Sequence, residues 1–249
     1  MENEQNGNPV TVEGLRKSFG AQAVLKGVSF SLARGQILSV LGRSGTGKSV
    51  LLRLLIGLDK PDAGSIRMNG DEITELGLEK LNESRKNIGF LFQQAALYDS
   101  LSIEENVEFP LRRHRKAGEA EPRERAHQLL ASVGLEKDLN KMPSQISGGM
   151  KKRVALARAL ALDPSIVLFD EPTAGLDPIT AAEIGRLIVD LSKQRNMTSV
   201  VVTHDMHAAK CFSDRLILLS DGKIVVDGTF EDLQNSTDEF AKRFLSDCA

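Results

Sequence analysis

The chain has 249 residues, of which 41% are hydrophobic and 27% charged, a composition typical of a globular domain with one substantial core. Its formal net charge of -2 provides no general attraction to a polyanion, so we expect no nucleic acid among its partners. No apolar stretch approaches the roughly 20 residues that span a bilayer, and Cys211 and Cys248 have no metal-binding spacing.

Residues 1–9 are polar and acidic, and we expect them to be disordered and not a signal peptide. Short segments of alternating hydrophobicity follow at residues 10–15 and 24–30. Such alternation predicts strands with one buried face, and Gly20 lies where a turn would join them as an antiparallel pair.

A glycine-rich loop lies between an apolar strand expected at Ile37–Leu41 and an apolar helix expected at residues 48–56. Its spacing, G-x-x-x-x-G-K-S, is that of a phosphate-binding P-loop. Glycine lets the backbone N–H groups approach a polyphosphate, and the positive end of the helix points at the same phosphates. The lysine would reach the terminal phosphates and the last serine would coordinate Mg²⁺. The loop therefore predicts nucleotide binding by Gly42, Arg43, Ser44, Gly45, Thr46, Gly47, Lys48 and Ser49.

The middle of the chain changes from strands to helices. Residues 64–70 are expected to form a hairpin strand that ends in an Asn-Gly turn, and residues 88–92 a short apolar strand. After Gln93 the apolar residues have helical spacing, over residues 103–111, 123–133 and 151–162. A mainly helical block is therefore inserted into the fold.

From Ser165 onward strands and helices alternate again, which predicts an α/β sheet with the P-loop at the carboxyl end of a strand. The expected strands are residues 166–169, 198–203, 216–220 and 223–226, and the expected helices are Pro178–Gln194, Phe230–Gln234 and residues 238–246.

A basic run, Arg-Arg-His-Arg-Lys, occupies residues 112–116. One interpretation is a solvated helix end and loop. The other is an electrostatic contact with a partner or with anionic lipid head groups.

The strand at 166–169 ends in two acids, Asp170 and Glu171. Carboxylates at the carboxyl end of a strand near the P-loop strand are placed to meet magnesium and water. Asp170 suits the metal, and Glu171 suits a general base that polarises the attacking water. The alternative is a pair of helix N-cap acids, since Pro172 follows, but a P-loop in the same chain disfavours it.

A Ser-Gly-Gly sequence, Ser147 to Gly149, precedes the helix expected at 151–162. At a helix start it forms either an ordinary N-cap or a second anion-binding nest. A second phosphate site so far from the P-loop makes chemical sense if two chains each supply half of a pocket.

These motifs, in this order, resemble the nucleotide-binding subunit of an ABC transporter over nearly the whole chain. Ser147, Gly148 and Gly149 match the ABC signature, Gln93 the Q-loop, Asp177 the D-loop, and His204 the switch histidine. Phe19 occupies the place of the aromatic that stacks on adenine. By themselves, Phe19 would be a core residue and His204 a strand-end histidine with a structural hydrogen bond.

The resemblance implies one nucleotide-binding domain over residues 1–249. Its fold would be α/β, a P-loop NTPase ABC ATPase core with an antiparallel β subdomain and a helical subdomain inserted at residues 94–163. It would bind ATP and Mg²⁺ and hydrolyse ATP, with Glu171 and His204 as catalytic residues. The metal ligands would be Ser49, Gln93 and Asp170.

The resemblance also implies partners. Two copies would form a head-to-tail dimer, with ATP between the P-loop of one chain and Ser147 and Gly149 of the other. The helical subdomain would dock a multi-pass membrane permease. The chain would then be a peripheral protein at the cytoplasmic face of a bacterial inner membrane.

The signature departs from the family's usual Leu-Ser-Gly-Gly-Gln, because residues 146–150 have the sequence Ile-Ser-Gly-Gly-Met. Met150 cannot make the polar contacts of a glutamine. Ser-Gly-Gly-Met is similar to the signature of ATPases paired with MCE-protein lipid transporters such as the Mla phospholipid system, and residues 93–112 and 169–180 also look like that group. We therefore expect phospholipid transport, with an MCE-domain lipid-binding protein in the complex.

Three alternatives stay open at this stage. A small-solute importer, for amino acids or a similar solute, would use the same chemistry with another permease. A soluble ABC protein of assembly or translation usually carries two cassettes, whereas this chain has a single P-loop. A non-catalytic cassette should have lost Lys48, Glu171 or His204, and all three are present.

Overall fold

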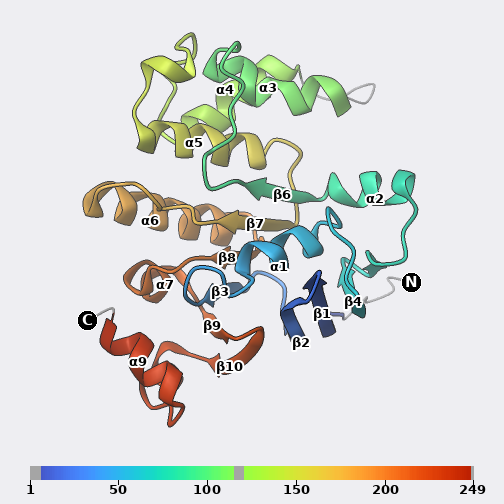
Figure 1. The fold of residues 1–249 in the computed structure, drawn as a ribbon. Coiled ribbons are helices and arrows are strands. Elements are labelled where there is room, and N and C mark those ends of the chain that lie inside the picture. Colours follow the sequence, from blue (N-terminus) through green and yellow to red (C-terminus); the bar gives the residue numbers. More distant parts are fainter. Residues whose placement is uncertain (1–6, 115–120, 248–249) are drawn as a thin grey trace.

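The computed structural model describes residues 7–114 and 121–247, whose strands form two sheets (Figure 1). The smaller sheet is antiparallel, with the order β2-β1-β4-β5. Its strands are β1 (Val10–Phe19), β2 (Gln22–Leu32), β4 (Ala63–Met68) and β5 (Asp71–Glu72). The expected hairpins are therefore confirmed, and positive φ angles at Asn69 and Gly70 (50° and 89°) make the turn between β4 and β5.

The larger sheet has the order β10-β9-β3-β8-β7-β6. All its neighbouring strands are parallel except the edge strand β10, which returns antiparallel to β9. Its strands are β3 (Ile37–Leu41), β6 (Ile88–Leu91), β7 (Ile166–Asp170), β8 (Thr198–Val202), β9 (Arg215–Ser220) and β10 (Lys223–Gly228).

Helices cover the large sheet and extend beyond one edge of it (Figure 1). They are α1 (Lys48–Leu55), α2 (Leu78–Arg85), α3 (Ile103–His114), α4 (Pro122–Ser132), the 3₁₀ turn η1 (Pro143–Gln145), α5 (Gly148–Ala159), α6 (Pro178–Gln194), α7 (Met206–Phe212), α8 (Phe230–Gln234) and α9 (Glu239–Asp247).

The central strands are buried on both faces, which explains their continuous apolar sequences. In β7, Ile166 and Leu168 pack with α1 and the antiparallel sheet. Val167 and Phe169, on the other face, pack with α6 and the helical block. Because side chains alternate along a strand, one short strand contributes to both halves of the core.

The helical block, α3 to α5, lies between β6 and β7 in the chain and forms one side of the molecule in Figure 1. It shares its core with the sheet: Ile103 of α3, Leu129 of α4 and Val154 of α5 belong to the same hydrophobic cluster as Phe169. We keep 94–163 as the proposed bounds of this subdomain.

Several elements differ from expectation. Helix α5 begins at Gly148, not residue 151, because the Ser147 side chain caps it by accepting a hydrogen bond from the Met150 N–H (3.2 Å). Helix α3 continues through Pro110 to His114. Helices α2 and α7 were not expected: α2 buries only Leu81 and Ser84 and so carries little periodic signal, and α7 has only seven residues.

Some expectations concern residues that the structure does not describe. Disorder of residues 1–6, the end of the basic run (Arg115 and Lys116) and Cys248 lie outside the described residues. Pro9 is buried, and its carbonyl accepts a hydrogen bond from the Asn69 N–H (2.7 Å). Within the described ranges, no helix is long and apolar enough to cross a bilayer.

Candidate active site

The candidate site lies where three parallel strands end together. In the register of the sheet, Val40 of β3 pairs with Val202 of β8, and Val202 pairs in turn with Asp170 of β7. The residues that follow these strands therefore emerge side by side at one edge, as expected for a ligand site in an open α/β sheet. These residues are the P-loop, His204 and Glu171.

The shape of the P-loop depends on glycine at two positions. Gly47, at φ 100°, starts helix α1, and a Cβ there would lie 2.9 Å from side-chain atoms of Val24 and Leu25. Gly42 has φ 156°, and its Cβ would lie 2.6 Å from the Leu219 carbonyl oxygen. A side chain at either position would force the loop away from the antiparallel sheet or from β9.

Lys48 lies inside this loop and is only 7% exposed. Its Nζ donates hydrogen bonds to the carbonyl oxygens of Gly42 (2.8 Å) and Arg43 (3.0 Å). Burial lowers the pKa of Lys48, while the nearby carboxylates of Glu171 and Asp170 oppose that shift. A buried cation thus faces the backbone cradle where polyphosphate is expected.

Ser49 and Asp170 form the part of the site that suits a hard cation. The Ser49 hydroxyl donates to Asp170 Oδ1 at 3.3 Å. Burial raises the pKa of Asp170, and the Ser49 hydrogen bond opposes that rise. Within the described residues no three His, Cys, Asp or Glu side chains gather to hold a metal. Mg²⁺ is usually bound through one or two carboxylates together with substrate phosphates, and Asp170 is one carboxylate at this position.

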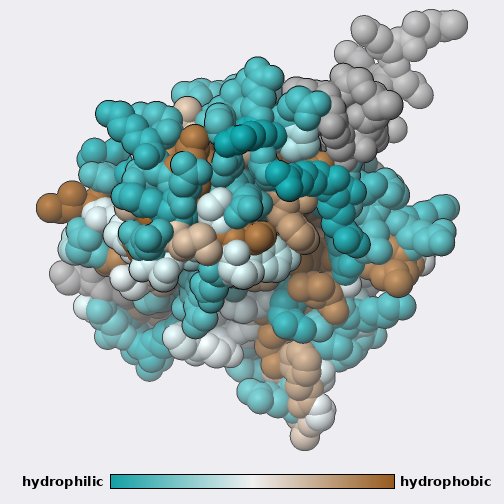
Figure 2. Space-filling view, turned by 90° about the horizontal axis from the view of Figure 1, so that it is seen from above, coloured by the Kyte–Doolittle hydropathy of each residue, from teal (hydrophilic) through white to brown (hydrophobic). Residues whose placement is uncertain are grey.

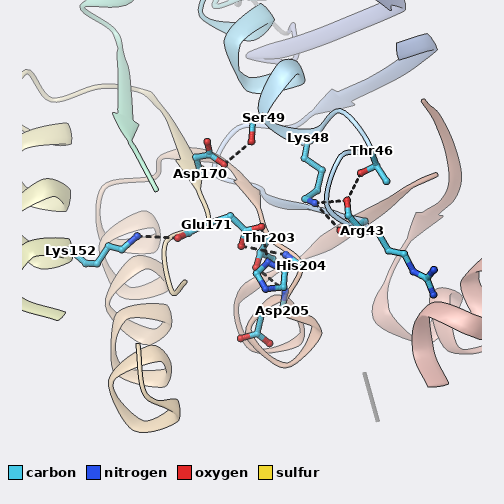
Figure 3. Close-up of polar contacts among 11 residues, drawn as sticks. Arg43, Thr46, Lys48, Ser49, Lys152, Asp170, Glu171, Thr203, His204 and Asp205 are labelled. Atoms are coloured by element: carbon cyan, nitrogen blue, oxygen red, sulfur yellow. Dashed lines mark hydrogen bonds and ion pairs between the residues drawn. The ribbon is translucent and has the colours of Figure 1, made fainter. Parts of the chain in front are cut away.

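Glu171 is held tightly beside His204 (Figure 3). Its Oε1 accepts a hydrogen bond from His204 Nδ1–H (2.9 Å), and its Oε2 accepts one from the His204 backbone N–H (3.4 Å). Glu171 has φ 48°, an uncommon value for a residue with a side chain, and is 8% exposed. The next helix, α6, is capped by Asp177 and not by either acid, which removes the N-cap alternative for Asp170 and Glu171.

A cavity of about 320 Å³ brings together part of the predicted nucleotide residues, whereas Gly42 and Asp170 are not among the described residues that line it. Phe19 lines it and is 50% exposed, so it is not a core residue. Arg43 and Thr46 belong to the same loop without lining the cavity, and Thr46 Oγ1 donates to the Arg43 carbonyl (2.9 Å). The described residues that line the cavity are Phe19, Val24, Ser44, Gly45, Gly47, Lys48, Ser49, Val50, Gln93 and Glu171.

The signature residues lie elsewhere in the chain's structure. Ser147 caps α5, and the two glycines face α6 and the loop before it: a Cβ on Gly149 would lie 2.6 Å from Thr180 Cγ2, and one on Gly148 would lie 3.5 Å from Leu176 Cδ2. None of the three is among the described residues that line the P-loop cavity.

Asp177 is also outside the cavity and accepts hydrogen bonds from the backbone N–H groups of Ile179 (3.1 Å) and Thr180 (3.0 Å). These hydrogen bonds, those from Thr180 foremost, lower the pKa of Asp177. A nucleotide contact by Asp177 or by the signature stays a prediction.

Two contacts at the site were not foreseen. Lys152 of α5 donates to main-chain carbonyls of Gln93 and Glu171. The Arg43 side chain forms an ion pair with Asp247 of α9 and lies 5.7 Å from the ring centroid of Phe240. Lys152 is the middle residue of a Lys-Lys-Arg run at residues 151–153, a pattern that is typical of a solvated surface and gives no sign that this lysine is buried.

Comparisons with known proteins agree with this geometry. Residues 25–174 match the family model described as ABC transporter. The chain is 42% identical over 240 residues to the probable ribonucleotide transport ATP-binding protein mkl of Mycobacterium tuberculosis, which covers 96% of this chain and 67% of the relative. It is 42% identical over 221 residues to the methionine import ATP-binding protein MetN of Brucella suis. That match covers 88% of this chain and 59% of the relative.

Solved structures of similar fold include two cassettes. The ATP-binding cassette MJ0796, in a dimeric post-hydrolysis state bound to ADP and Pi, is 37% identical with a TM-score of 0.80, covering 88% of this chain and 98% of that one. The protein cbiO1 of Clostridium perfringens, part of the ABC transporter complex cbiONQ, is 30% identical with a TM-score of 0.85, covering 96% and 95%.

Proposed function

Because the chain belongs to the ABC transporter family, as an ATP-binding subunit, we propose that it powers phospholipid transport between membranes through an MCE-associated permease complex. The similarity to the two solved cassettes confirms the expected ABC ATPase fold. The chain is an ATPase of this family, and its cofactors are ATP and Mg²⁺. The transported substrate and the assignment of each residue's role are the proposal.

The observation that carries the proposed catalytic roles is the convergence of Lys48, Ser49, Asp170 and Glu171 at one sheet edge. Lys48 and the loop N–H groups would hold the phosphates. The metal, which neutralises phosphate charge when bound, would be held by Ser49, by Asp170 beside it, and by Gln93, which lines the same cavity as Ser49.

In this proposal Glu171 takes the proton of the attacking water. His204 orients the carboxylate, because its side chain and backbone both donate to it. A direct contact of His204 with the γ-phosphate is also proposed. It requires the imidazole, whose side chain is 60% exposed, to face the phosphate of bound ATP.

We propose that a second copy completes the site in a head-to-tail dimer. Within one chain, Ser147 and Gly149 lie apart from the P-loop cavity at the start of α5, where Ser147 is exposed and Gly149 is buried. The N-terminus of this helix suits an anion supplied by another chain. The dimeric state of MJ0796 supports such an arrangement.

The proposed docking surface for a membrane permease lies beside the helical block. A cavity of about 430 Å³ between the end of β6, α3 and α5 is rich in aromatic side chains, and Phe92, Tyr98 and Phe109 are 41%, 45% and 42% exposed. On the face seen in Figure 2, hydrophobic side chains gather along a recess while most of the surrounding surface is hydrophilic. Exposed aromatic side chains suit a protein partner. Phe92 lies between the end of β6 and Gln93, so this surface adjoins the nucleotide site.

Phospholipid as cargo is supported by the signature. Met150 is half-buried and packs against the hydrophobic cluster of the helical block. The fifth signature position therefore contributes to packing, and its methionine is one of the residues on which the resemblance to MCE-associated ATPases rests. Import of a small solute is the second candidate, favoured by the methionine importer MetN among the relatives.

The test is an affinity pull-down of this subunit from detergent-solubilised membranes, with the partners identified by mass spectrometry. A multi-pass permease together with an MCE-domain protein is the expected result, and it would fit the proposed peripheral location at the cytoplasmic face of the inner membrane. Recovery of a solute permease would overturn the cargo. Recovery of no membrane protein would favour a soluble ABC ATPase.

A further inference from the structure

Lys152 is a buried cation that joins two segments of the site. It lies on α5 and is only 5% exposed. Its Nζ donates hydrogen bonds to the main-chain carbonyls of Gln93 (2.5 Å) and Glu171 (3.0 Å). In Figure 3 it reaches Glu171 from the neighbouring helix. One ammonium therefore bridges the chain segments that follow β6 and β7.

The environment of Lys152 favours a positioning role over a charge-pairing one. Both of its hydrogen bonds in the described structure go to main-chain carbonyls and neither goes to a carboxylate. Burial lowers the pKa of Lys152, while the charges of Glu171 and Asp170 oppose that shift. A buried cation is tolerated where its N–H groups donate hydrogen bonds, and here those hydrogen bonds go to backbone carbonyl oxygens.

The Glu171 backbone depends on being held. Its φ of 48° is in the left-handed region, which a residue with a side chain occupies only when the surroundings enforce it. Its N–H donates to the Val202 carbonyl (2.9 Å), and its carbonyl accepts from the Ala174 N–H (3.2 Å) and from Lys152. Of these three hydrogen bonds to the Glu171 backbone, the one from Lys152 comes from the helical block.

Helix α5 holds the Gln93 loop at a second point. Arg158 donates to the carbonyls of Ala96 (2.8 Å, Nη1) and Ala95 (2.8 Å, Nη2). Both alanines have positive φ angles, 62° at Ala95 and 49° at Ala96. The loop after β6 is therefore fixed to α5 at Gln93 and again at Ala95 and Ala96.

The other end of α5 is the signature, because Ser147 is its N-cap residue. A short helix with a continuous hydrogen-bonded backbone moves as one piece. A displacement of Ser147 would then move the Lys152 and Arg158 contacts, and with them the Gln93 loop and the Glu171 backbone.

We propose that Lys152 is a positioning residue for ATP hydrolysis, which ties the helix carrying the signature to the backbone of both Gln93 and Glu171. This inference rests on the proposed roles of those two residues. It adds a specific link within one chain by which engagement of the signature by a second copy would align the water-activating carboxylate.

The test compares ATP turnover and ATP binding of full-length variants. Lys152→Met removes the donors and the charge while keeping a long side chain, and Lys152→Gln keeps a neutral donor. We expect kcat to fall by about 10- to 100-fold in Lys152→Met and less in Lys152→Gln, the size of loss that a small misplacement of a catalytic group produces. The KM for ATP should stay within about twofold, because Lys152 does not line the nucleotide cavity.

Lys151→Met is the matched control, since it removes the same charge from the adjacent, half-buried position of the same helix. Its kcat should equal that of the unmodified chain. Glu171→Gln distinguishes a failure of the proposed role of Glu171 from a failure of the role of Lys152. If that variant keeps full turnover, the proposed role of Glu171 fails and the inference fails with it.

Other outcomes concern Lys152 alone. Unchanged kcat in folded Lys152→Met, with Glu171→Gln inactive, would overturn the positioning role and leave the proposed function standing. An equal effect in Lys151→Met, or a large rise in KM, would also overturn it. Loss of folding in both Lys152 variants would assign this lysine to stability instead.

Discussion

At the scale of single residues, the proposed general base gives the sharpest prediction. Glu171→Gln removes the proton acceptor but keeps the size of the side chain and one of the two oxygens that accept hydrogen bonds from His204. We expect ATP binding to be retained and turnover to fall by about 10²- to 10⁴-fold, the usual contribution of general acid–base catalysis. Steady-state ATPase assays and equilibrium nucleotide binding would measure the two effects.

His204→Ala is the companion variant, because it removes the side-chain hydrogen bond to the Glu171 carboxylate and leaves only the one from the backbone N–H. Its turnover should fall while Glu171 stays present. Full activity in Glu171→Gln would rule out the assigned base, and full activity in His204→Ala would rule out the orienting role of the histidine.

Asp170 links catalysis to stability through its pKa. Burial raises this pKa above 3.8, the ordinary value of an aspartate side chain. The folded chain then holds this proton more tightly than the unfolded chain does. Its contribution to stability is fully present below pH 3.8 and is lost as the pH rises through the raised pKa. At neutral pH the ionised Asp170 therefore destabilises the nucleotide-free fold.

We expect Asp170→Asn to raise the melting temperature of the nucleotide-free chain at neutral pH while lowering its ATPase activity. The gain in melting temperature should shrink as the pH is lowered toward 3.8. Calorimetry over a pH series measures this. Asp177→Asn is a control that should lower the melting temperature at neutral pH, because hydrogen bonds lower the pKa of Asp177 and favour its charged form. A lower melting temperature in Asp170→Asn at neutral pH would contradict the argument.

At the scale of elements, the start of α5 depends on one hydroxyl. Ser147 Oγ accepts from the Met150 N–H (3.2 Å), and this cap makes the helix begin at Gly148. Ser147→Ala should lower the free energy of unfolding by about 1 kcal/mol, the usual loss of an N-cap. For a chain of this size that corresponds to a melting temperature lower by about 2–4 °C.

Ser147→Thr is the matched control, because threonine keeps a hydroxyl that can cap. Its melting temperature should stay close to that of the unmodified chain in the same calorimetric experiment. Equal losses in the alanine and threonine variants would show that the hydroxyl does not stabilise the helix start.

At the scale of the whole molecule, the shared-site model predicts complementation between two inactive chains. Lys48→Ala should lose nucleotide affinity, because it removes a charge-assisted contact of about 1.5–3 kcal/mol. Ser147→Arg should keep nucleotide binding in the single chain but block hydrolysis that depends on the dimer. A mixed dimer of the two variants contains one site with an unmodified P-loop and an unmodified signature.

The mixture should therefore hydrolyse ATP although neither variant does so alone. Titration of one variant into the other, followed by phosphate release, measures this. If no ratio of the two chains restores activity, the model in which an active site combines the P-loop of one copy with the signature of the other is wrong.

The P-loop and the strands could be predicted from the sequence alone, because each depends on the chemistry of a few neighbouring residues. The glycine spacing reflects backbone shapes that a side chain would block, as at Gly47, and the apolar run of β7 reflects burial on both faces. Such requirements act within a few residues and can be recognised in any chain. The acids after β7 were assigned for the same reason, since a strand end fixes where Asp170 and Glu171 emerge.

Only the tertiary structure decided which distant groups meet. Strand β3 lies between β8 and β9, although more than 150 residues separate them in the chain, and Lys152 finds its partners 59 and 19 residues away. The structure likewise separated Ser147 and Asp177 from the nucleotide cavity of their own chain. Hydrogen bonds of this kind depend on the order of strands in the sheet and on helix packing. These arise from the burial of the whole core, which no local pattern of residues encodes.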